Sequence, residues 1–373
     1  MKLKLVLKRI VKWTGVAIVL AFSVGLIALL IAYWRSTNDC DRLTAVQGDT
    51  MKAIVYCDYG SPDVLKLVEI AKPVPNDDQA LIKVYAGSVN PYDFHFMRGE
   101  PYVMRMGTGL RKPKSTRLGV DFAGTIEGVG KNVKQFKPGD EVFGGKTGAF
   151  AEYVCLSEHS LVMKPENMTF DQAGAVQIAG LTALQALRDK GKVQAGQKVL
   201  INGASGGVGT FAVQIAKSFG AHVTGVCSAR NTEMVRSIGA DQVIDYTKED
   251  FTQTAQRFDV ILDTVSNRSL LECRRVLNPN GKYVIIGGAA GRWIAPMDRV
   301  INAALLSPFV SQEMGMMLAK VKQEDLMILR DLMQAGKVTP VIDRRYKFSE
   351  VPAAIRYLEE GHARGKVVIN FDL

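Results

Sequence analysis

The chain has 373 residues, of which 47% are hydrophobic and 23% charged, and its formal net charge at pH 7 is +10. This length and balance are typical of a folded protein with two domains and an appendage, and they argue against disorder. Residues 1–50 hold seven Lys and Arg against three Asp, a net charge of +4, so the remainder carries +6 without a dense basic helix. We therefore expect no nucleic-acid partner.

Five cysteines are scattered along the chain, and their number is odd. They lack the close, even spacing that indicates a disulfide framework. We therefore expect reduced, buried thiols at Cys40, Cys57, Cys155, Cys227 and Cys273.

The first predicted element is a transmembrane helix. Residues 14–33 carry no charged side chain, and this length matches the hydrocarbon core of a bilayer. Trp13, Tyr33 and Trp34 stand at the ends of the run, where interfacial aromatic residues belong. A secretory signal peptide is the alternative, but its apolar region is shorter and ends in small residues. The sequence therefore predicts a retained anchor over 13–34 in contact with membrane lipid, then a polar tether over 36–50.

From residue 51 the pattern changes to short β-rich runs separated by turn signals, for example after 60–62 and 76–78. Further runs of this kind cover 118–130, 137–144 and 148–156. They predict an irregular, mostly β domain. A helical segment over 171–188 then leads into a different kind of fold.

That second fold begins at 198–209, where the apolar run KVLIN passes directly into the glycines Gly203, Gly206 and Gly209. Apolar residues at helical spacing over 208–219 predict a helix after the turn. A strand, a glycine turn and a helix in this order are typical of a dinucleotide-binding unit, in which backbone N–H groups approach a pyrophosphate. The alternation continues, with strands expected at 222–227, 242–246, 258–265 and 282–287 and a helix at 232–238.

Beyond residue 288 the pattern is less regular. The apolar run 293–318 is interpreted as core or as a contact between subunits in a homodimer, ahead of a substrate-side lid. Residues 337–343, a helix over 351–359 and a strand over 366–371 read as further pieces of the first β domain. The chain would then leave that domain, build the nucleotide fold and return.

Four stretches in this order resemble the medium-chain dehydrogenase/reductase superfamily, and within it the zinc-free quinone oxidoreductase-like branch. They are GSVNPYD at 87–93, LGVDFAG at 118–124, KPGDEV at 137–142 and NGASGGVG at 202–209. The resemblance covers about residues 51–373. It implies an α/β fold in which a Rossmann domain (176–310) is inserted into a GroES-like catalytic domain (51–175 and 311–373), with residues 1–50 outside both.

The same resemblance raises the question of a metal. Zinc-dependent relatives place a Cys and a His at positions where this chain has Asn90 and Val120, and no Cys or His occurs from 161 to 221. Zinc needs thiolate, imidazole or carboxylate ligands, and a valine side chain cannot bind it. We therefore expect no zinc.

Without a metal, the negative charge that develops on a substrate oxygen needs a hydrogen-bond donor or a proton. The resemblance implies that Asn90, Tyr92, Asp93 and His95 line the cleft. Each has a structural alternative: Asn90 as a loop cap, Asp93 as a carboxylate that fixes the helix start, and Tyr92 and His95 as packed rings.

The end of the second strand of the nucleotide unit favours NADPH over NADH. NAD-specific folds place an acidic residue there, about twenty residues after the glycines. This chain instead offers Ser228 and Arg230 to a 2′-phosphate, with no carboxylate before Glu233. The resemblance adds Tyr246. It also extends the expected cofactor contacts to Thr182, Gly203, Ser205, Gly206, Gly207, Val208, Gly209, Gly287 and Lys366.

These inferences predict a membrane-anchored, zinc-independent, NADPH-dependent reductase of a quinone, an enone or a reactive aldehyde. An NADP-dependent alcohol or aldehyde dehydrogenase and a non-catalytic NADPH-binding membrane adaptor are the alternatives. The orientation of the anchor stays open: five basic residues before the run favour a cytoplasmic N-terminus and export of the rest, whereas the cofactor pool favours a cytoplasmic catalytic domain.

Overall fold

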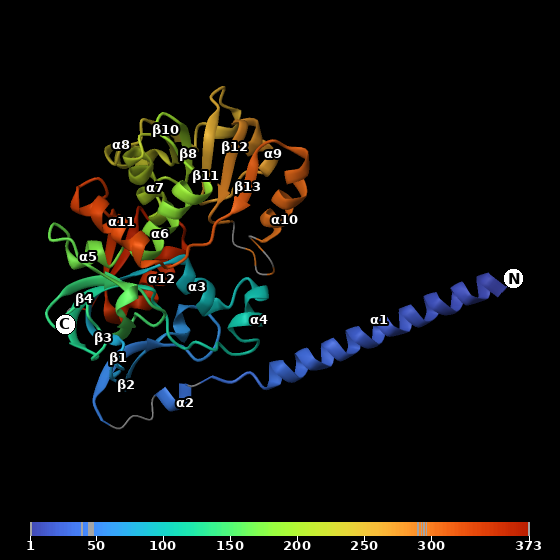
Figure 1. Ribbon diagram of the computed structural model, residues 1–373, viewed down its shortest axis with the longest axis horizontal. Coiled ribbons are helices and arrows are strands. Elements are labelled where there is room, and N and C mark those ends of the chain that lie inside the picture. The colour runs from blue at the N-terminus through green and yellow to red at the C-terminus, as the bar shows by residue number, and fades with distance from the viewer. Residues whose placement is uncertain are drawn as a thin grey trace.

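The computed structural model describes residues 2–38, 40–43, 48–288, 291, 293, 295 and 297–371. Two halves built on β-sheets pack against each other, and helix α1 (Lys2–Trp34) projects away from both (Figure 1). The half that contains β8 to β13 is formed by the middle of the chain. The other half combines segments from both sides of it, so the two are joined by more than one connection.

The first half is a six-stranded parallel sheet in the order β10-β9-β8-β11-β12-β13. Strand β8 is buried along Val199, Leu200 and Ile201, because helices cover both faces of a parallel sheet. The strands are β8 (Lys198–Asn202), β9 (His222–Cys227), β10 (Gln242–Asp245), β11 (Phe258–Asp263), β12 (Leu277–Ile285) and β13 (Glu313–Met316). The helices of this half are α6 (Gln177–Gln185), α7 (Gly207–Ser218), α8 (Thr232–Ser237), α9 (Leu270–Arg275) and α10 (Met297–Leu306).

The second half is a largely antiparallel seven-stranded sheet with the path β14-β15-β3-β4-β5-β7, in which β6 also pairs with β3. Its strands are β3 (Gln79–Val89), β4 (Asp121–Val129), β5 (Glu141–Gly144), β6 (Tyr153–Ser157), β7 (Leu161–Met163), β14 (Ile342–Lys347) and β15 (Lys366–Asn370). A separate pair, β1 (Thr50–Val55) and β2 (Lys66–Ala71), packs beside it. The helices here are α3 (Pro91–Arg98), α4 (Arg105–Thr108), α5 (Phe170–Ala173), α11 (Gln323–Gln334) and α12 (Val351–Glu359).

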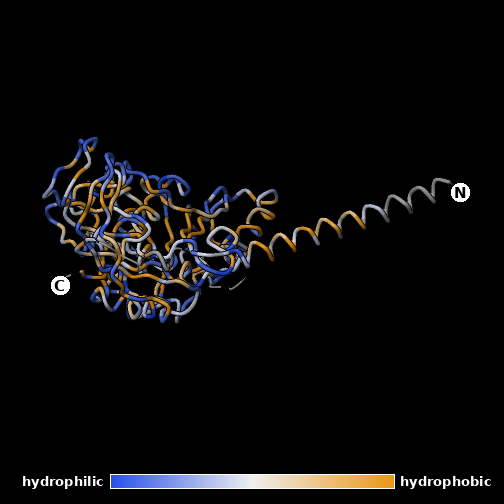
Figure 2. Tube along the Cα trace, turned by 90° about the horizontal axis from the view of Figure 1, so that it is seen from below, coloured by the Kyte–Doolittle hydropathy of each residue, from blue (hydrophilic) through white to orange (hydrophobic). Residues whose placement is uncertain are grey.

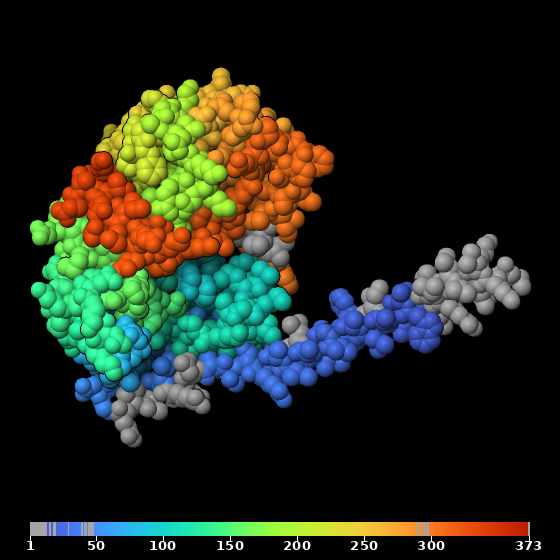
Figure 3. Space-filling view, in the orientation of Figure 1, coloured from blue at the N-terminus to red at the C-terminus, as the bar shows by residue number. Residues whose placement is uncertain are grey.

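The return of the chain into this second sheet is its main topological feature. Strand β15 lies between β14 and β3 and pairs antiparallel with β3, Val367 opposite Val89 and Asn370 opposite Ala86. The surface is hollowed where the two halves meet, between the teal segment near α3 and the green and red segments above it (Figure 3).

The prediction of five reduced cysteines is wrong at two positions. Cys40, in the short helix α2 (Cys40–Leu43), forms a disulfide with Cys57. Asn38 supports it by donating from Nδ2 to the Cys57 carbonyl at 2.6 Å. The tether expected over 36–50 is therefore docked on the second half through part of its length, because Cys40 packs with Met51, Ala53 and Ile70. Cys155, Cys227 and Cys273 are free and buried, as predicted.

The prediction of a single-pass membrane anchor is also contradicted. Spanning a bilayer takes about 20 consecutive, predominantly apolar residues. Within the described residues, no helix meets that requirement for length and apolar character. The prediction was made from the whole run 14–33. Four side chains of that run, at 15, 18, 19 and 29, lie outside the described part of the structure. Along the projecting part of α1 the residues nearest the folded halves are apolar (Figure 2).

Candidate active site

The turn between β8 and α7 has the geometry of a phosphate-binding site. Gly203 adopts a positive φ of 86°, which an L side chain rarely tolerates. A Cβ on Gly209 would lie 2.1 Å from the Gly203 carbonyl oxygen, so the turn closes only with glycine at that position. Gly206 precedes Gly207, the first residue of α7, and no described side chain caps this helix. The first N–H groups of a helix have no partner within it, so they can face an anion. The residues present therefore fit the pyrophosphate of a dinucleotide.

Ser205 and Ser228 come together although they belong to different loops. Asn231 donates from Nδ2 to the Ser205 hydroxyl at 3.0 Å and to the Ser228 hydroxyl at 3.3 Å. Asn231 is not among the residues predicted from the sequence, because its place after Arg230 carries no signal beyond a polar helix start. Its Oδ1 is buried without a partner within the described residues. An unpaired polar atom beside two hydroxyl groups fits a polar ligand at this position.

Arg230 and Tyr246 lie at the same edge of the parallel sheet. Arg230 donates from Nη2 to the His362 carbonyl at 3.0 Å, and the Tyr246 backbone N–H donates to the Cys227 carbonyl at 3.1 Å. Tyr246 is 47% exposed. Both residues thus lie beside the C-terminal end of β9, the region where the 2′-phosphate is expected.

The other residues predicted to contact the cofactor lie around the turn or on the helix beside it. A Cβ on Gly287, just after β12, would lie 2.4 Å from the Thr264 carbonyl oxygen. A Cβ on Gly203 would lie 2.2 Å from the Thr264 hydroxyl oxygen. Both glycines therefore pack against Thr264, the residue after β11. Val208 is half-buried in the first turn of α7. Thr182 is half-buried in α6, a helix that packs against α7 and is not part of the turn itself.

Asp93 is placed as a structural carboxylate at the start of α3. It is fully buried and accepts hydrogen bonds from the backbone N–H groups of Asn90 at 2.7 Å and Gly119 at 2.9 Å. Burial raises the pKa of this carboxyl from 3.8 to about 7, against the effect of the two N–H donors. This geometry ties the loop at 90–93 to the loop before β4.

Both N–H donors of the Asn90 side chain are engaged by protein groups. Its Nδ2 donates to the Ser88 carbonyl at 3.1 Å and to Asp121 Oδ2 at 2.9 Å, while its Oδ1 accepts from Lys366 Nζ at 2.5 Å. An amide has two N–H donors, and both are used here. In this arrangement Asn90 holds the loop and the lysine and has no N–H left for a substrate.

Tyr92 and His95 lie on α3, one turn apart. The Tyr92 ring stacks on Phe96 with centroids 4.0 Å apart, and its hydroxyl lies 3.2 Å from the Thr147 hydroxyl. Burial raises the pKa of Tyr92, so its hydroxyl stays protonated at neutral pH. His95 Nδ1 lies 2.9 Å from the Glu100 carbonyl, which can only accept, so Nδ1 carries a proton. Burial lowers the pKa of His95 and favours the neutral ring.

The expected zinc-ligand positions, Asn90 and Val120, carry neither a thiolate nor an imidazole nor a carboxylate. Val120 is buried next to Asp121, and its carbonyl accepts from Gln177 Nε2 at 3.3 Å. Within the part of the chain that is described, no group of three or more His, Cys, Asp or Glu side chains is arranged to hold a metal ion. Zinc independence stays a prediction that rests on the residue types.

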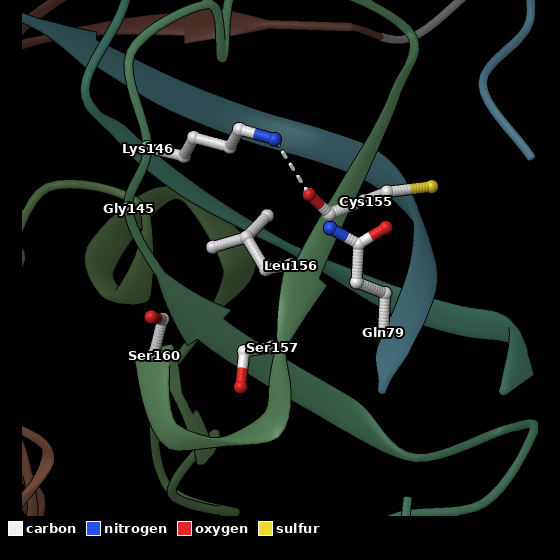
Figure 4. Close-up of a pocket in the computed structure, with 7 residues that line it drawn as sticks. All are labelled: Gln79, Gly145, Lys146, Cys155, Leu156, Ser157 and Ser160. Carbon is white, nitrogen blue, oxygen red and sulfur yellow. Dashed lines mark hydrogen bonds between the residues drawn. The ribbon is translucent and has the colours of Figure 1, made fainter. Parts of the chain in front are cut away.

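A cavity of about 240 Å³ lies elsewhere in the second half, and none of the predicted site residues lines it. Figure 4 shows the Lys146 ammonium donating to the Cys155 carbonyl, at 2.8 Å, while the Cys155 thiol points away from the lysine. The lysine charge therefore does not face the sulfur. The cavity is lined by Gln79, Gly145, Lys146, Cys155, Leu156, Ser157 and Ser160.

Comparison with known proteins gives two family matches. Residues 76–166 match the alcohol dehydrogenase GroES-like domain, and residues 238–369 match a family described as zinc-binding dehydrogenase. The second description mentions zinc, whereas the residues at the ligand positions of this chain are Asn90 and Val120.

Relatives extend the likeness over most of the chain. A 2-methylene-furan-3-one reductase from Solanum lycopersicum is 37% identical over 86% of this chain and 79% of its own length. An NADPH-dependent alkenal/one oxidoreductase of Arabidopsis thaliana chloroplasts is 36% identical over the same shares. The solved quinone oxidoreductase from Coxiella burnetii superposes with a TM-score of 0.77 at 32% identity, covering 87% of this chain and 100% of that one.

Proposed function

Because this chain belongs to the quinone oxidoreductase-like branch of the medium-chain dehydrogenase/reductase superfamily, we propose that it transfers a hydride to a quinone, an enone or a reactive aldehyde without zinc. It is an NAD(P)H-dependent oxidoreductase, and its cofactor is NADPH. When bound, NADPH supplies the hydride.

One observation carries this proposal: the phosphate turn (residues 203–207) and the catalytic loop (residues 90–93) are linked through Lys366. Gly365, just before β15, forms a parallel bridge with Gly206 of the turn. The next residue, Lys366, reaches Asn90 at the start of α3 with its Nζ. The turn and the loop that carries Tyr92 are therefore neighbours at the junction of the two halves, which supports a site that uses both.

Tyr92 is the side chain best suited to stabilise the developing negative oxygen. Its hydroxyl is protonated at neutral pH, and it accepts from Thr147 when it donates elsewhere. Asn90 has both N–H groups occupied, and Asp93 is held by two backbone donors. His95 is neutral, with its Nδ1–H held by a carbonyl group. For an enone or a quinone no stronger acid is needed, because solvent can protonate the enolate or hydroquinone anion.

The test is steady-state oxidation of NADPH by the full chain across a panel of quinones, alkenals and saturated aldehydes. Each acceptor is assayed with and without a strong zinc chelator. We expect turnover with at least one conjugated acceptor and no loss of rate with the chelator. Binding of NADPH without turnover on any acceptor would contradict the proposal and favour a non-catalytic role.

An NADP-dependent alcohol dehydrogenase is the second candidate. The same assay run in reverse, with NADP⁺ and a series of primary and secondary alcohols, separates the two. Faster turnover of alcohols than of conjugated acceptors would favour that candidate, and chelator sensitivity would add a metal that the residue types at Asn90 and Val120 do not predict.

A further inference from the structure

A buried ion pair lies between the phosphate turn and the catalytic loop. Lys366 is 3% exposed and Asp121 1% exposed, and Lys366 Nζ lies 3.2 Å from Asp121 Oδ2. Buried charges are costly unless they are paired and hydrogen-bonded. Asp121 stands in the run LGVDFAG and has no role among the residues predicted from the sequence.

The Asp121 carboxylate is held from three further directions. It accepts from the Ser88 hydroxyl at 2.7 Å, from Asn90 Nδ2 at 2.9 Å and from the Ile178 backbone N–H at 2.9 Å. Ser88 belongs to β3 and Ile178 to the start of α6, so the carboxylate is fixed by both halves of the protein. With this many donors its position is set before any ligand binds.

The lysine side chain lies against the positive end of α7. A Cβ on Gly207 would meet Lys366 Cδ at 3.3 Å, so the aliphatic part of the lysine covers the first residue of that helix. A cation near a helix N-terminus is unfavourable on its own, because both carry positive charge. An anion at the turn removes this conflict. Lys366 Nζ has three N–H groups, and the described protein groups accept two of them, at Asn90 Oδ1 and Asp121 Oδ2.

We propose that Asp121 is a positioning residue of the hydride-transfer site: it holds the Lys366 ammonium between the phosphate turn and Asn90, ready for an anionic cofactor. This inference rests on the proposed function and adds a residue to its machinery. Lys366 supplies a preorganised positive charge, and Asp121 fixes where that charge stands. The same carboxylate fixes the Asn90 amide, so cofactor site and catalytic loop share one anchor.

A purely structural ion pair makes a different prediction for the double variant. Removing one partner of a buried pair leaves an uncompensated charge and destabilises the fold, whereas replacing both restores much of the stability. We therefore compare Asp121→Asn, Lys366→Met and the double variant. Asp325→Asn is the matched control, because Asp325 is also buried and paired, with Arg188 and Gln185, but lies away from the site.

Three quantities are measured on the full-length protein: the melting temperature, the Kd of NADPH by fluorescence quenching, and kcat. We expect both single variants to melt lower and the double variant to recover most of that loss. The Kd for NADPH should nevertheless stay weakened by about tenfold to a hundredfold in the double variant, and kcat lowered to a similar degree. Asp325→Asn should lower the melting temperature and leave Kd and kcat near their wild-type values.

Recovery of Kd and kcat together with the melting temperature in the double variant would overturn the inference and leave a structural ion pair. Failure of the proposed function is distinguishable, because the wild type would then bind NADPH and reduce no acceptor. NADH serves as a second probe: loss of the Lys366 charge should weaken the binding of both cofactors by the same factor, since the 2′-phosphate is expected at Arg230. A loss confined to NADPH would also contradict the inference.

Discussion

At the scale of single residues, Arg230 is the side chain that most directly favours NADPH over NADH. Its guanidinium is oriented by the His362 carbonyl beside Ser228 at the end of β9, and no carboxylate of the loop 228–231 competes with it. We predict that Arg230→Gln lowers the affinity for NADPH by about 1.5–3 kcal/mol, the value of a charge-assisted hydrogen bond. The affinity for NADH should change little. Fluorescence titration with both cofactors measures this, and equal losses for the two would contradict it.

Tyr92 is tested by removing one oxygen atom. Tyr92→Phe keeps the ring stacked on Phe96 and loses only the hydroxyl that faces Thr147. If this hydroxyl stabilises the developing oxyanion, kcat should fall by about 100-fold with the Kd of NADPH unchanged. Tyr357→Phe is the control, because that hydroxyl binds Asp343 in another part of the fold. Equal kcat in Tyr92→Phe and wild type would assign the ring to packing alone.

Asp93 gives a pH dependence whose sign can be worked out. Because its pKa is raised from 3.8 to about 7, the folded state keeps a proton that the unfolded chain releases above about pH 4. Its contribution to the free energy of unfolding therefore declines as pH rises from about 4 to about 7. Asp93→Asn cannot titrate. We expect the difference in unfolding free energy, wild type minus variant, to be larger near pH 5 than near pH 8 in urea titrations. A difference that is constant with pH would contradict the burial argument.

Site residues could be predicted from the sequence where the residues that bind one ligand group lie close together in the chain. The glycines at 203–209 and the Ser228–Arg230 pair stand in one short segment each, so their spacing alone suggests a ligand. Asp121 and Lys366 are 245 positions apart and meet only through the pairing of β15 with β3. A signal existed, because a carboxylate within an apolar strand sequence requires a buried partner. The identity of that partner could not be read from the sequence.

At the scale of elements, helices and strands were predicted correctly where the hydrophobic periodicity and the flanking turn residues indicate the same bounds. The helix expected at 351–359 is α12 with the same bounds, and the strands expected at 198–202, 222–227 and 242–246 are β8, β9 and β10 within one residue. The predicted helical segment 171–188 is divided into α5, α6 and a following π-turn. Strand β13 was missed because it lies within the apolar run 293–318, where no alternation separates strand from helix.

The disulfide between Cys40 and Cys57 is an element that sequence spacing did not reveal. It closes a loop with a sequence separation of 17 and fixes α2 against β1. A separate contact precedes it in the chain: the Ser36 hydroxyl accepts from the Arg111 and Lys112 backbone N–H groups. We predict that Cys40→Ser combined with Cys57→Ser lowers the stability of this region by about 3 kcal/mol. Hydrogen exchange of β1 and of residues 105–114 should speed up together.

Treatment with a thiol reductant supplies the internal control for that prediction. The wild type with reductant should reproduce the exchange rates of the double variant, and the double variant should not respond to reductant at all. Exchange of residues 105–114 that is unchanged in every case would mean that the N-terminal segment does not brace this loop.

At the scale of the whole molecule, the two halves depend unequally on the chain ends. The parallel sheet is formed by strands within 198–316, whereas the antiparallel sheet needs β15, which arrives last and pairs with β3 directly before Asn90. The return of the chain to the antiparallel sheet was predicted from the strand pattern at 366–371. It could not supply the order of strands, because strand order is set by pairing over long sequence separations.

This topology predicts the behaviour of a chain that ends at residue 359. Such a chain lacks β15, so β3 presents unpaired backbone groups over 86–89, and Lys366 is lost with the strand. The parallel sheet should remain folded, while NADPH binding and the cooperative melting of the antiparallel sheet should be lost. A synthetic peptide covering 360–371 should restore both by adding the missing strand, and a scrambled peptide should restore neither. Unchanged NADPH affinity in the shortened chain would show that the last strand contributes nothing to the site, contrary to the bridge between Gly206 and Gly365.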